Sequence, residues 1–473
     1  MGICGSNPNA GAGIKLSTPS VAKRRPKGEF VVFLGRASNL PNMDSSLRAN
    51  DVTDCYARIQ LKDENGVPIS PEFRSQIRED TLDPIWNTYA AFACKPLDED
   101  MVCVSIFDHD DLSKDDYIGY LEVPVLEIRK FSIAKPCNFV LKLETTIKPL
   151  KEDQLSTISL GTMQANECCV PGREKDAGFG VEKEFWLIRH GESKWNEAEH
   201  NHAIGDMLAY DHPLNKTGIE QALQFNSKWR SIQQDKTYNM TEAEKGFLNA
   251  ERVIASPLTR AIQTALLTCH SHKNLGKGDG DRPGRPLLLL RNLREKKNKS
   301  ISLDTVGQCI GDQIAKRVLE QMVEENWKEN PEKGKKYMED IEVNDCNSKW
   351  WTGKSHGDSR GMMTSRYDEL WNYCKYMKEK TAILVGHSLF FREMQQRYLD
   401  DEFCENEKEF TDRLKAHKLD NASCLYVRVK FPVPSSLLKN EPKIVQAELI
   451  FGSRLKEKHE PDEDDNHEQA EKK

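Results

Sequence analysis

Two kinds of hydrophobic pattern divide this chain, and the change falls between residues 147 and 180. Before it, short apolar runs of β type alternate with polar turns, as at 30–34, 56–61 and 101–107. Short strands at this spacing, separated by turn residues, are typical of a β-sandwich. The pattern therefore predicts an all-β sandwich domain over 28–146, followed by a linker at 147–180 that is rich in Ser, Gly and charged residues.

Beyond the linker, runs typical of buried strands alternate with helical patterns. Three continuous apolar runs end abruptly at polar residues: 185–188, 253–256 and 382–386. The segments 314–327 and 367–378 have the spacing of helices. Strands that are apolar throughout belong to sheets covered on both faces. We therefore predict an α/β domain over 181–453, with a mostly parallel sheet flanked by helices.

Composition agrees with two domains and limits the classes of function. The chain has 473 residues, 38% of them hydrophobic, which is enough to bury two independent cores. No apolar run approaches the roughly 18 residues of a membrane-spanning helix, so any membrane attachment is expected to be peripheral. Thirteen cysteines at irregular spacing favour a reducing compartment such as the cytoplasm. A net charge of −7 offers no footprint for nucleic acid, and the charge-dense segment 454–473 is predicted to be a disordered tail.

Charged side chains follow the three buried runs. Arg189 and His190 come directly after the first run, and His387 comes directly after the third. Arg260 lies shortly beyond the second, near a predicted helix N-terminus, where anions are favoured. Open α/β sheets build their ligand sites at the C-terminal edge of the strands, so we expect these side chains to converge on one cationic site. A neutral histidine there is a nucleophile, and arginine provides a planar fork for phosphate oxygens.

The sequence blocks around these residues resemble one enzyme family. They are Arg-His-Gly-Glu-Ser at 189–193, Asp-His-Pro-Leu at 211–214, Ser-Pro-Leu-Thr-Arg-Ala-Ile-Gln-Thr-Ala at 256–265 and Gly-His-Ser at 386–388. In this order they resemble the signature of the histidine phosphatase superfamily, which has the phosphoglycerate-mutase-like fold. The resemblance covers roughly residues 182 to 452.

The resemblance implies a role for each matching residue. His190 would attack phosphorus and become phosphohistidine, while the phosphoryl oxygens would be held by Arg189, Asn196, Arg260 and a protonated His387. The cations around His190 would keep its imidazole neutral and nucleophilic near pH 7. The family implies no metal or other cofactor for catalysis.

A general acid is expected on the loop after a Leu-rich strand. Glu295 matches the acid position of the family, and Asp304 is the alternative. Lysines follow Glu295 at 296, 297 and 299, where glycolytic mutases have an aromatic or Gly-rich loop. The stretch 203–210 also replaces the Gly-Trp-Xaa-Asp block of those mutases. Both departures favour a phosphatase over a glycolytic mutase. The sequence leaves the class of phosphorylated substrate open.

The N-terminal domain resembles a C2 domain, the calcium-dependent lipid-binding module. The segment Thr-Leu-Asp-Pro-Ile-Trp-Asn at 81–87 and the Asp-Xaa-Asp loop at 108–110 match its pattern. The calcium-binding carboxylates carry over as Asp44, Asp54, Asp108, Asp110 and Asp116, with Asp51 as a substitute in a long first loop. Hard oxygen ligands gathered at one end of a sandwich suit Ca²⁺. The resemblance implies anionic membrane lipids as partners.

The N-terminus contains a lipidation pattern. Gly2 and Ser6 fit an N-myristoylation site, and Cys4 beside it is a candidate for palmitoylation. A single myristoyl chain binds membranes weakly, so a second signal is expected, such as Cys4 or the basic cluster within 1–27. We expect residues 1–27 to anchor the protein peripherally on the cytoplasmic face of a membrane.

Together these features predict a membrane-tethered histidine phosphatase that hydrolyses a phosphomonoester and is targeted by a calcium-dependent C2 domain. Two alternatives stay open. Because a fold guarantees no activity, the chain could be a catalytically inactive, calcium-responsive membrane adaptor. It could also be a phosphomutase, which differs only in the acceptor of the phosphoryl group.

Overall fold

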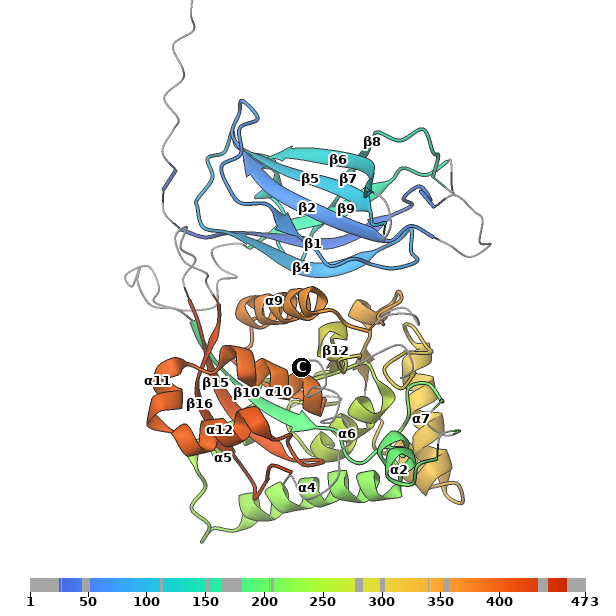
Figure 1. Ribbon diagram of the computed structural model, residues 1–473, viewed down its shortest axis with the longest axis vertical. Coiled ribbons are helices and arrows are strands. Elements are labelled where there is room, and N and C mark those ends of the chain that lie inside the picture. Colours follow the sequence, from blue (N-terminus) through green and yellow to red (C-terminus); the bar gives the residue numbers. More distant parts are fainter. Residues whose placement is uncertain are drawn as a thin grey trace, which may run out of the picture.

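The computed structural model describes residues 25–26, 28–44, 52–110, 114–149, 151, 153–163, 181–203, 205, 208–276, 284–297, 303–338, 340–351, 357–432 and 441–456. Two domains are stacked along the long axis of the molecule (Figure 1). The N-terminal sandwich domain lies above the α/β domain in this view, and helix α9 (Arg360–Tyr376) is the part of the α/β domain that lies next to the sandwich. The predicted fold class, a sandwich followed by an α/β domain, is confirmed.

The sandwich domain consists of two antiparallel sheets and one short helix. One sheet has the strand order β4-β1-β9-β7 and the other has the order β3-β2-β5-β6-β8. The elements are β1 (Phe30–Ser38), β2 (Cys55–Lys62), β3 (Phe73–Arg74), β4 (Ile85–Phe92), β5 (Met101–Asp108), β6 (Asp116–Pro124), α1 (Val125–Ile128), β7 (Cys137–Val140), β8 (Lys142–Leu143) and β9 (Thr157–Thr162).

Alternation of side chains along each strand builds the sandwich core. Ile59 of β2, Trp86 of β4 and Val104 of β5 point inward and are buried in one cluster. Strand β9 lies within 147–180, which the sequence assigned to a linker, and it pairs with both β1 and β7. The sandwich sheet therefore continues through Thr162, because the short apolar run in β9 can be buried against the sheet.

The α/β domain has a seven-stranded sheet with the order β13-β12-β11-β14-β10-β15-β16. Its strands are β10 (Val181–Arg189), β11 (Arg252–Ala255), β12 (Leu287–Leu289), β13 (Ile341–Glu342), β14 (Thr381–Gly386), β15 (Cys424–Phe431) and β16 (Lys443–Leu449). The five strands from β13 to β10 are parallel to their neighbours, whereas β15 and β16 are antiparallel. The mostly parallel sheet predicted from the apolar runs is confirmed.

Helices cover both faces of this sheet. They are α2 (Lys194–His200), α4 (Lys216–Gln234), α5 (Glu242–Asn249), α6 (Thr259–Cys269), the 3-10 helix η1 (Arg291–Leu293), α7 (Gln313–Asn326), α8 (Pro331–Lys335), the 3-10 helix η2 (Asn344–Cys346), α9, α10 (Ser388–Tyr398), α11 (Asp401–Asn406) and α12 (Lys408–Ala416). In the part of the chain that the structure describes, no helix combines the length and the apolar character needed to cross a bilayer.

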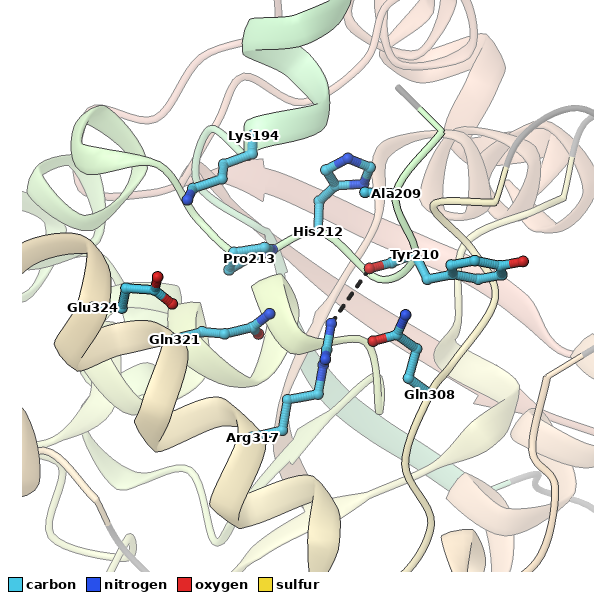
Figure 2. A pocket seen from close by; sticks show the side chains of 9 residues that line it. All are labelled: Lys194, Ala209, Tyr210, His212, Pro213, Gln308, Arg317, Gln321 and Glu324. Atoms are coloured by element: carbon cyan, nitrogen blue, oxygen red, sulfur yellow. Dashed lines mark hydrogen bonds between the residues drawn. The ribbon is translucent and has the colours of Figure 1, made fainter. Parts of the chain in front are cut away.

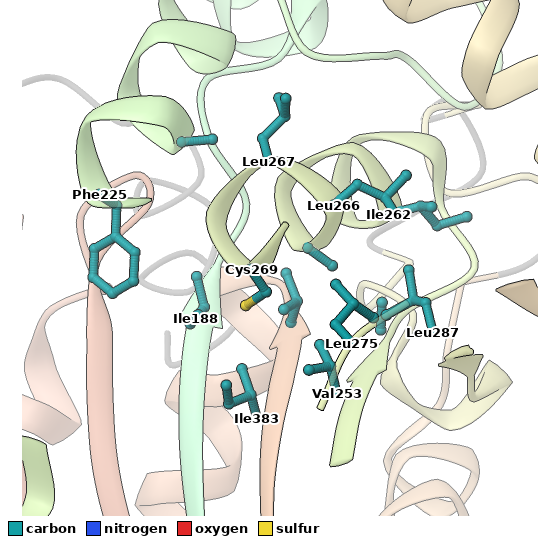
Figure 3. Close-up of a cluster of buried hydrophobic side chains, with 14 of the residues drawn as sticks. Ile188, Phe225, Val253, Ile262, Leu266, Leu267, Cys269, Leu275, Leu287 and Ile383 are labelled. Carbon is teal, nitrogen blue, oxygen red and sulfur yellow. The ribbon is translucent and has the colours of Figure 1, made fainter. Parts of the chain in front are cut away.

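Successive residues of the central strands enter two different cores. Ile188, Val253 and Ile383 face α6, as Figure 3 shows, whereas Leu187 and Leu384 face the opposite side with α9 and α10. All five are buried, and each fully buried large apolar side chain contributes about 1.5–3 kcal/mol. This double burial explains why the central strands are apolar throughout.

The two domains contact each other through α9 and the β4 sheet. The ring of Tyr89 lies 5.4 Å from that of Tyr376 and packs in a small cluster with Val31. At the edge of this cluster, Lys375 of α9 forms an ion pair of 2.8 Å with Glu29. Apolar packing and ion pairs therefore both join the domains.

Candidate active site

The two histidines that the sequence singled out lie at the ends of neighbouring parallel strands. Strands β10 and β14 pair so that Arg189 lies opposite Gly386. The next residues are His190 and His387, and the backbone N–H of His190 donates to the carbonyl of Gly386 at 3.0 Å. Their imidazole centroids are 5.1 Å apart. The strand register therefore brings both rings to the C-terminal edge of the sheet.

His190 is held as a neutral imidazole. Its Nδ1 lies 2.7 Å from the carbonyl oxygen of Gly191, so Nδ1 carries the proton and Nε2 keeps its lone pair. The side chain is buried, and burial, then the charges of Arg260 and Arg189, lowers its pKa well below the usual value. An unprotonated Nε2 at neutral pH is the form that can attack phosphorus.

His387 is buried deeper still. Its Nε2 lies 2.8 Å from the hydroxyl oxygen of Ser256, and its Nδ1 makes no hydrogen bond to a described residue. Burial, followed by the charges of Arg260 and other neighbours, lowers its pKa well below the usual value. The sequence interpretation of a protonated His387 thus does not describe this arrangement. A phosphate dianion beside the ring would favour the protonated form.

Arg260 is fixed by a carboxylate from a distant segment. Its guanidinium contacts Asp304 at 3.0 Å through Nη1 and at 2.9 Å through Nη2. Asp304 also lies 2.7 Å from Nδ1 of His212. Although burial opposes it, Arg260 and then His212 hold the pKa of Asp304 below its usual range. Asp304 is therefore ionised and orients Arg260, which makes it poorly suited to the acid role that was its alternative interpretation.

The start of helix α6 is also fixed by a buried acid. Asp211 accepts the backbone N–H of Thr259 and its hydroxyl, both at 2.7 Å. Thr259 is the first residue of α6, so the next residue, Arg260, projects from the first turn. Burial raises the pKa of Asp211 in spite of these hydrogen bonds. Both residues of the pair 211–212 therefore help to position Arg260. Asp211 fixes the start of the helix that carries it, and His212 contacts Asp304, which holds its guanidinium.

Arg189 is the last residue of β10, directly before His190, and Asn196 lies in the first turn of α2. Nη1 of Arg189 donates to the carbonyl of Leu419 at 2.8 Å, which fixes the guanidinium direction. Asn196 and Ser193 form a capping box at the start of α2, in which Oδ1 of Asn196 accepts the backbone N–H of Ser193 at 3.1 Å. The amide nitrogen of Asn196 takes no part in that cap.

Glu295 is buried beside the N-terminus of helix α10. This helix begins directly after His387. The Glu295 carboxylate accepts the backbone N–H groups of Phe390 at 3.0 Å and Leu389 at 3.4 Å. Burial raises its pKa, while the backbone hydrogen bond from Lys296, the charge of Arg260 and the backbone hydrogen bond from Phe390 oppose the rise. A carboxyl group with a raised pKa suits general acid catalysis, and Arg260 is near enough to both Glu295 and His190 to influence their ionisation.

The loop that holds the nucleophile depends on two glycines. Gly191 packs on Gly218 in the first turn of α4, and a Cβ on Gly218 would lie 2.0 Å from the carbonyl oxygen of Glu192. Asn215 caps α4 by accepting the backbone N–H of Gly218 at 2.9 Å. The helix terminus and the nucleophile loop are therefore in direct backbone contact.

A cavity of about 430 Å³ lies beside this cluster (Figure 2). His212 lines it and connects it to Asp304, while Arg317 reaches it from α7. Arg317 donates to the carbonyl of Tyr210 at 3.4 Å. The cavity is also lined by Lys194, Ala209, Pro213, Gln308, Gln321 and Glu324.

In the sandwich domain, the predicted calcium residues lie at one end. The backbone N–H of Asp54 donates to the carboxylate of Asp108 at 2.6 Å, and Asp116 lies opposite Asp108 in the β5–β6 pairing. Burial, then the charges of Asp44, Asp54 and Asp110, raises the pKa of Asp108 to about 7. Burial also raises the pKa of Asp54 to about 6. The described residues form no ready-made cluster of three metal-binding side chains.

Sequence reasoning missed the supporting residues Ser256, Asp211 and His212. All three lie inside the motif blocks, so the sequence shows where they are. It does not show their hydrogen bonds, which join Ser256 to His387, Asp211 to Thr259 and His212 to Asp304. The predicted lipidation sites Gly2 and Cys4, and the substitute ligand Asp51, lie outside the described residues.

Comparison with known proteins identifies both domains. A model of the C2 domain matches residues 28–137, and a model of the histidine phosphatase superfamily (branch 1) matches residues 185–277. Over 60 residues the chain is 42% identical to intersectin-2 of Mus musculus, and over 52 residues it is 40% identical to intersectin-1 of Xenopus laevis. These matches cover 13% and 11% of this chain but only 4% and 3% of those relatives.

Among solved structures, the chain is similar to the first C2 domain of a plant extended synaptotagmin 1, with 18% identity and a TM-score of 0.24. That match covers 30% of this chain and 97% of the other. It is also similar to a calcium-bound pair of C2 domains from extended synaptotagmin 2, with 17% identity, a TM-score of 0.23, and coverage of 36% and 58%. The family matches and the strand order agree: the chain contains a C2 domain followed by a domain of the histidine phosphatase superfamily.

Proposed function

We propose that this protein is a phosphatase that hydrolyses a phosphomonoester through a phosphohistidine intermediate on His190. The observation that carries the proposal is the pair of imidazoles, His190 and His387, 5.1 Å apart between centroids at the C-terminal edge of the sheet. Arg260 influences the ionisation of both rings and is held in place by Asp304. Such an array of fixed positive charge suits phosphoryl transfer, which depends mainly on positioning and charge neutralisation.

In the proposed reaction, Nε2 of His190 forms a bond to phosphorus while the ester P–O bond breaks. The leaving oxygen takes the proton of Glu295. Water then attacks the phosphohistidine and gives its proton to the Glu295 carboxylate, and the P–N bond breaks with its electrons returning to His190. Arg189, Arg260, Asn196 and His387 would hold the phosphoryl oxygens during both steps.

The proposal is tested by trapping the intermediate. Purified protein is mixed with a labelled aryl phosphate, quenched in alkali and digested, and we expect an acid-labile label on the peptide that contains His190. His190→Asn should carry no label and show no hydrolysis, whereas His200→Asn, on an exposed position of α2, should behave like the parent. Hydrolysis without any labelled intermediate would remove His190 as the nucleophile.

The same experiment separates the alternatives. A stable label that water removes slowly but a second phosphate acceptor removes quickly would indicate a mutase. Absence of both label and hydrolysis, in a folded protein that still binds membranes, would favour the inactive adaptor.

We further propose that the C2 domain binds calcium and brings the enzyme to anionic membranes. The acids Asp44, Asp54, Asp108, Asp110 and Asp116 supply the hard oxygen ligands that Ca²⁺ prefers. Mutual repulsion of such carboxylates, which contributes to the raised pKa of Asp108, is relieved by a bound cation. N-terminal acylation at Gly2 and Cys4 would supply a second anchor.

Membrane binding is tested with phosphatidylserine vesicles in calcium or in a chelator. We expect calcium to increase sedimentation of the parent with vesicles, and Asp108→Asn with Asp110→Asn to abolish the increase. In cells, Gly2→Ala should move the protein from the membrane fraction to the cytosol. Equal sedimentation of the parent and the double variant would reject the calcium site, and unchanged fractionation of Gly2→Ala would reject the acylation.

A further inference from the structure

A second large cavity lies between the two domains, away from His190 and His387. Its volume is about 800 Å³. One wall comes from the C2 domain, from residues 74–80 together with Asp54 and His109. The other comes from the α/β domain, from η1 and Arg294, from 349–351, and from the N-terminus of α9. None of the phosphoryl-binding residues proposed above lines it. The cavity is therefore a place for a ligand that is separate from the cluster of His190 and His387, and it exists only because the domains are docked.

Buried arginines form much of the surface of this interdomain cleft. Arg78, Arg291, Arg294 and Arg366 all line it, and the side chain of each is 8% exposed or less. The carboxylates that contact them do not line the cavity: Arg78 contacts Glu369 at 3.3 Å, and Arg291 contacts Asp345 at 2.6 Å. Arg294 and Arg366 both contact the single carboxylate of Asp358, at 3.4 and 2.7 Å.

Two of these guanidiniums have donor atoms that the protein leaves unused. Nη1 of Arg291 and Nε of Arg366 are buried and make no hydrogen bond to a described residue. A buried donor without an acceptor is unfavourable, and an anionic ligand in the cleft would supply the missing acceptor. The surrounding positive charge also disfavours the protonated form of these guanidiniums. Burial, then the charge of Arg366, lowers the pKa of Arg294 to about 9, and burial, then Arg291, lowers that of Arg78 to about 10.

Helix α9 adds a third, independent source of positive potential. This helix has 17 residues and begins beside the cleft, where Ser359 is its N-cap. Gly361, Met362 and Ser365 from its first turns line the cavity. The N-terminal end of a helix dipole favours an anion, especially a phosphate group.

The opposite wall has a different chemistry. Glu79 and Asp80 line it and are bridged by Lys349, whose Nζ lies 3.0 Å from Glu79. Trp350 and Trp351 line the cavity from the α/β domain. Carboxylates accept hydrogen bonds from hydroxyl groups and aromatic rings pack on apolar ring faces, but carboxylates repel a bare phosphate ion. These side chains therefore suit a ligand that carries hydroxyl groups as well as phosphate.

We propose that the interdomain cleft binds a phosphorylated polyol, with its phosphate against Arg291, Arg294 and Arg366 and its hydroxyl groups toward Glu79 and Asp80. The ligand contacts both domains at once, so its binding stabilises their docked arrangement. The same chemistry is found in a soluble inositol phosphate and in the headgroup of a phosphoinositide lipid. The proposal does not depend on the phosphatase reaction.

The test uses two variants at Ser365 that differ from each other only in charge. This residue is half-buried, lies inside α9 and makes no hydrogen bond among the described contacts. Ser365→Glu places a carboxylate in the cleft, whereas Ser365→Gln has nearly the same size and no charge. Both are made in the full chain with His190→Asn, so that the active site consumes no ligand, and folding is checked by thermal melting.

Three probes are titrated: inorganic phosphate, inositol trisphosphate, and phosphatidylcholine vesicles with or without phosphatidylinositol bisphosphate, all in a chelator to silence calcium-dependent binding. We expect inositol trisphosphate to bind more tightly than inorganic phosphate, and Ser365→Glu to weaken its binding at least about tenfold relative to Ser365→Gln. The same charge sensitivity with the phosphoinositide vesicles would identify a lipid headgroup as the ligand, and sensitivity with the soluble probe alone would identify a free one.

Equal binding by the two Ser365 variants, or no binding of any probe by their parent, would overturn the proposal. Should Ser365→Glu fail to fold, Arg74→Glu and Arg74→Gln test the same charge from the C2 wall. Arg74 lies over the ring of Tyr56 and is 46% exposed, so both replacements are compatible with folding. Weaker binding by Arg74→Glu than by Arg74→Gln is expected, and equal binding by both would again contradict the cleft.

Discussion

Arg78 of the C2 domain and Glu369 of helix α9 form an ion pair of 3.3 Å in which the side chains are only 4% and 5% exposed. The same carboxylate accepts the backbone N–H of Gln76 at 3.0 Å and the side-chain amide of Asn292 at 3.2 Å. Asn292 lies in η1, three residues before Glu295. One buried acid therefore joins the C2 domain, helix α9 and the segment that leads to the proposed general acid.

Removing Glu369 should weaken this connection strongly. Glu369→Ala leaves Arg78 as a buried charge without this partner, and breaking such a pair costs about 3–5 kcal/mol. We expect the full chain to unfold at lower urea concentration, with the domains separating before the core of the phosphatase domain melts. Limited proteolysis followed by mass spectrometry would detect the separation.

Asp412→Ala is the matched control for Glu369→Ala, because it breaks an exposed ion pair on α12 with Lys408. It should leave the urea midpoint unchanged, since exposed pairs contribute little. A Glu369→Ala protein as stable as this control would show that the interdomain ion pair does not hold the domains together.

Gly218→Ala should displace the nucleophile loop. The new methyl group would lie 2.0 Å from the carbonyl oxygen of Glu192, which is backbone and cannot rotate away. Overpacking of this kind costs about 1–3 kcal/mol, and the shift reaches Gly191 and His190. We expect a lower melting temperature and a lower kcat for hydrolysis of an aryl phosphate. Gly205→Ala, where a methyl group meets nothing within 4 Å, should leave both unchanged, and equal effects of the two would argue against the close packing.

The proximity of His190 and His387 could be predicted from sequence because the signal for each is local. His190 and His387 each directly follow an apolar run, and parallel pairing of β10 with β14 brings such residues together. The partner of Arg260 could not be predicted in the same way, because Asp304 lies 44 residues away on a loop without periodicity. Chain pattern alone left Asp304 as an alternative acid, whereas the structure gives it an orienting role.

The contact between the two domains could not be predicted from the sequence for a related reason. Arg78 and Glu369 are 291 residues apart, and a surface charge shows no pattern until its partner is known. Strand β9 is a smaller instance. Its apolar run is only a few residues long and follows a stretch of turns and charged residues, so its pairing with β1 was hidden in a predicted linker.

The pH dependence of hydrolysis should report on Glu295. Burial raises the pKa of this carboxyl group, so its acid form persists to higher pH than that of an ordinary Glu. Because the proposed acid must be protonated, activity should fall on the alkaline side as Glu295 loses its proton. Glu295→Gln should reduce kcat by about 10²–10⁴-fold for an alkyl phosphate and remove that alkaline decline.

Nitrophenyl phosphate provides the internal control for Glu295→Gln, because its leaving group needs little protonation. The loss of kcat should therefore be much smaller with this substrate than with the alkyl phosphate. Equal losses for the two substrates would assign Glu295 a purely structural role at the start of α10, where it binds the N–H groups of Leu389 and Phe390.

Calcium affinity should rise with pH through the slightly acidic range. In the calcium-free domain, burial and then neighbouring charges raise the pKa of Asp54 to about 6 and that of Asp108 to about 7. Calcium requires both groups as carboxylates, so binding must release protons wherever they are still protonated. Affinity should therefore be weakest near pH 5, increase through these pKa values and level off near pH 8.

Calorimetry in buffers of different ionisation enthalpy measures the protons that calcium binding releases. Asp108→Asn should abolish binding, and Asp98→Asn, which lies before the opposite end of β5, should preserve both the affinity and the proton release. Calcium affinity that is independent of pH over this range would mean that these two acids do not hold the ion.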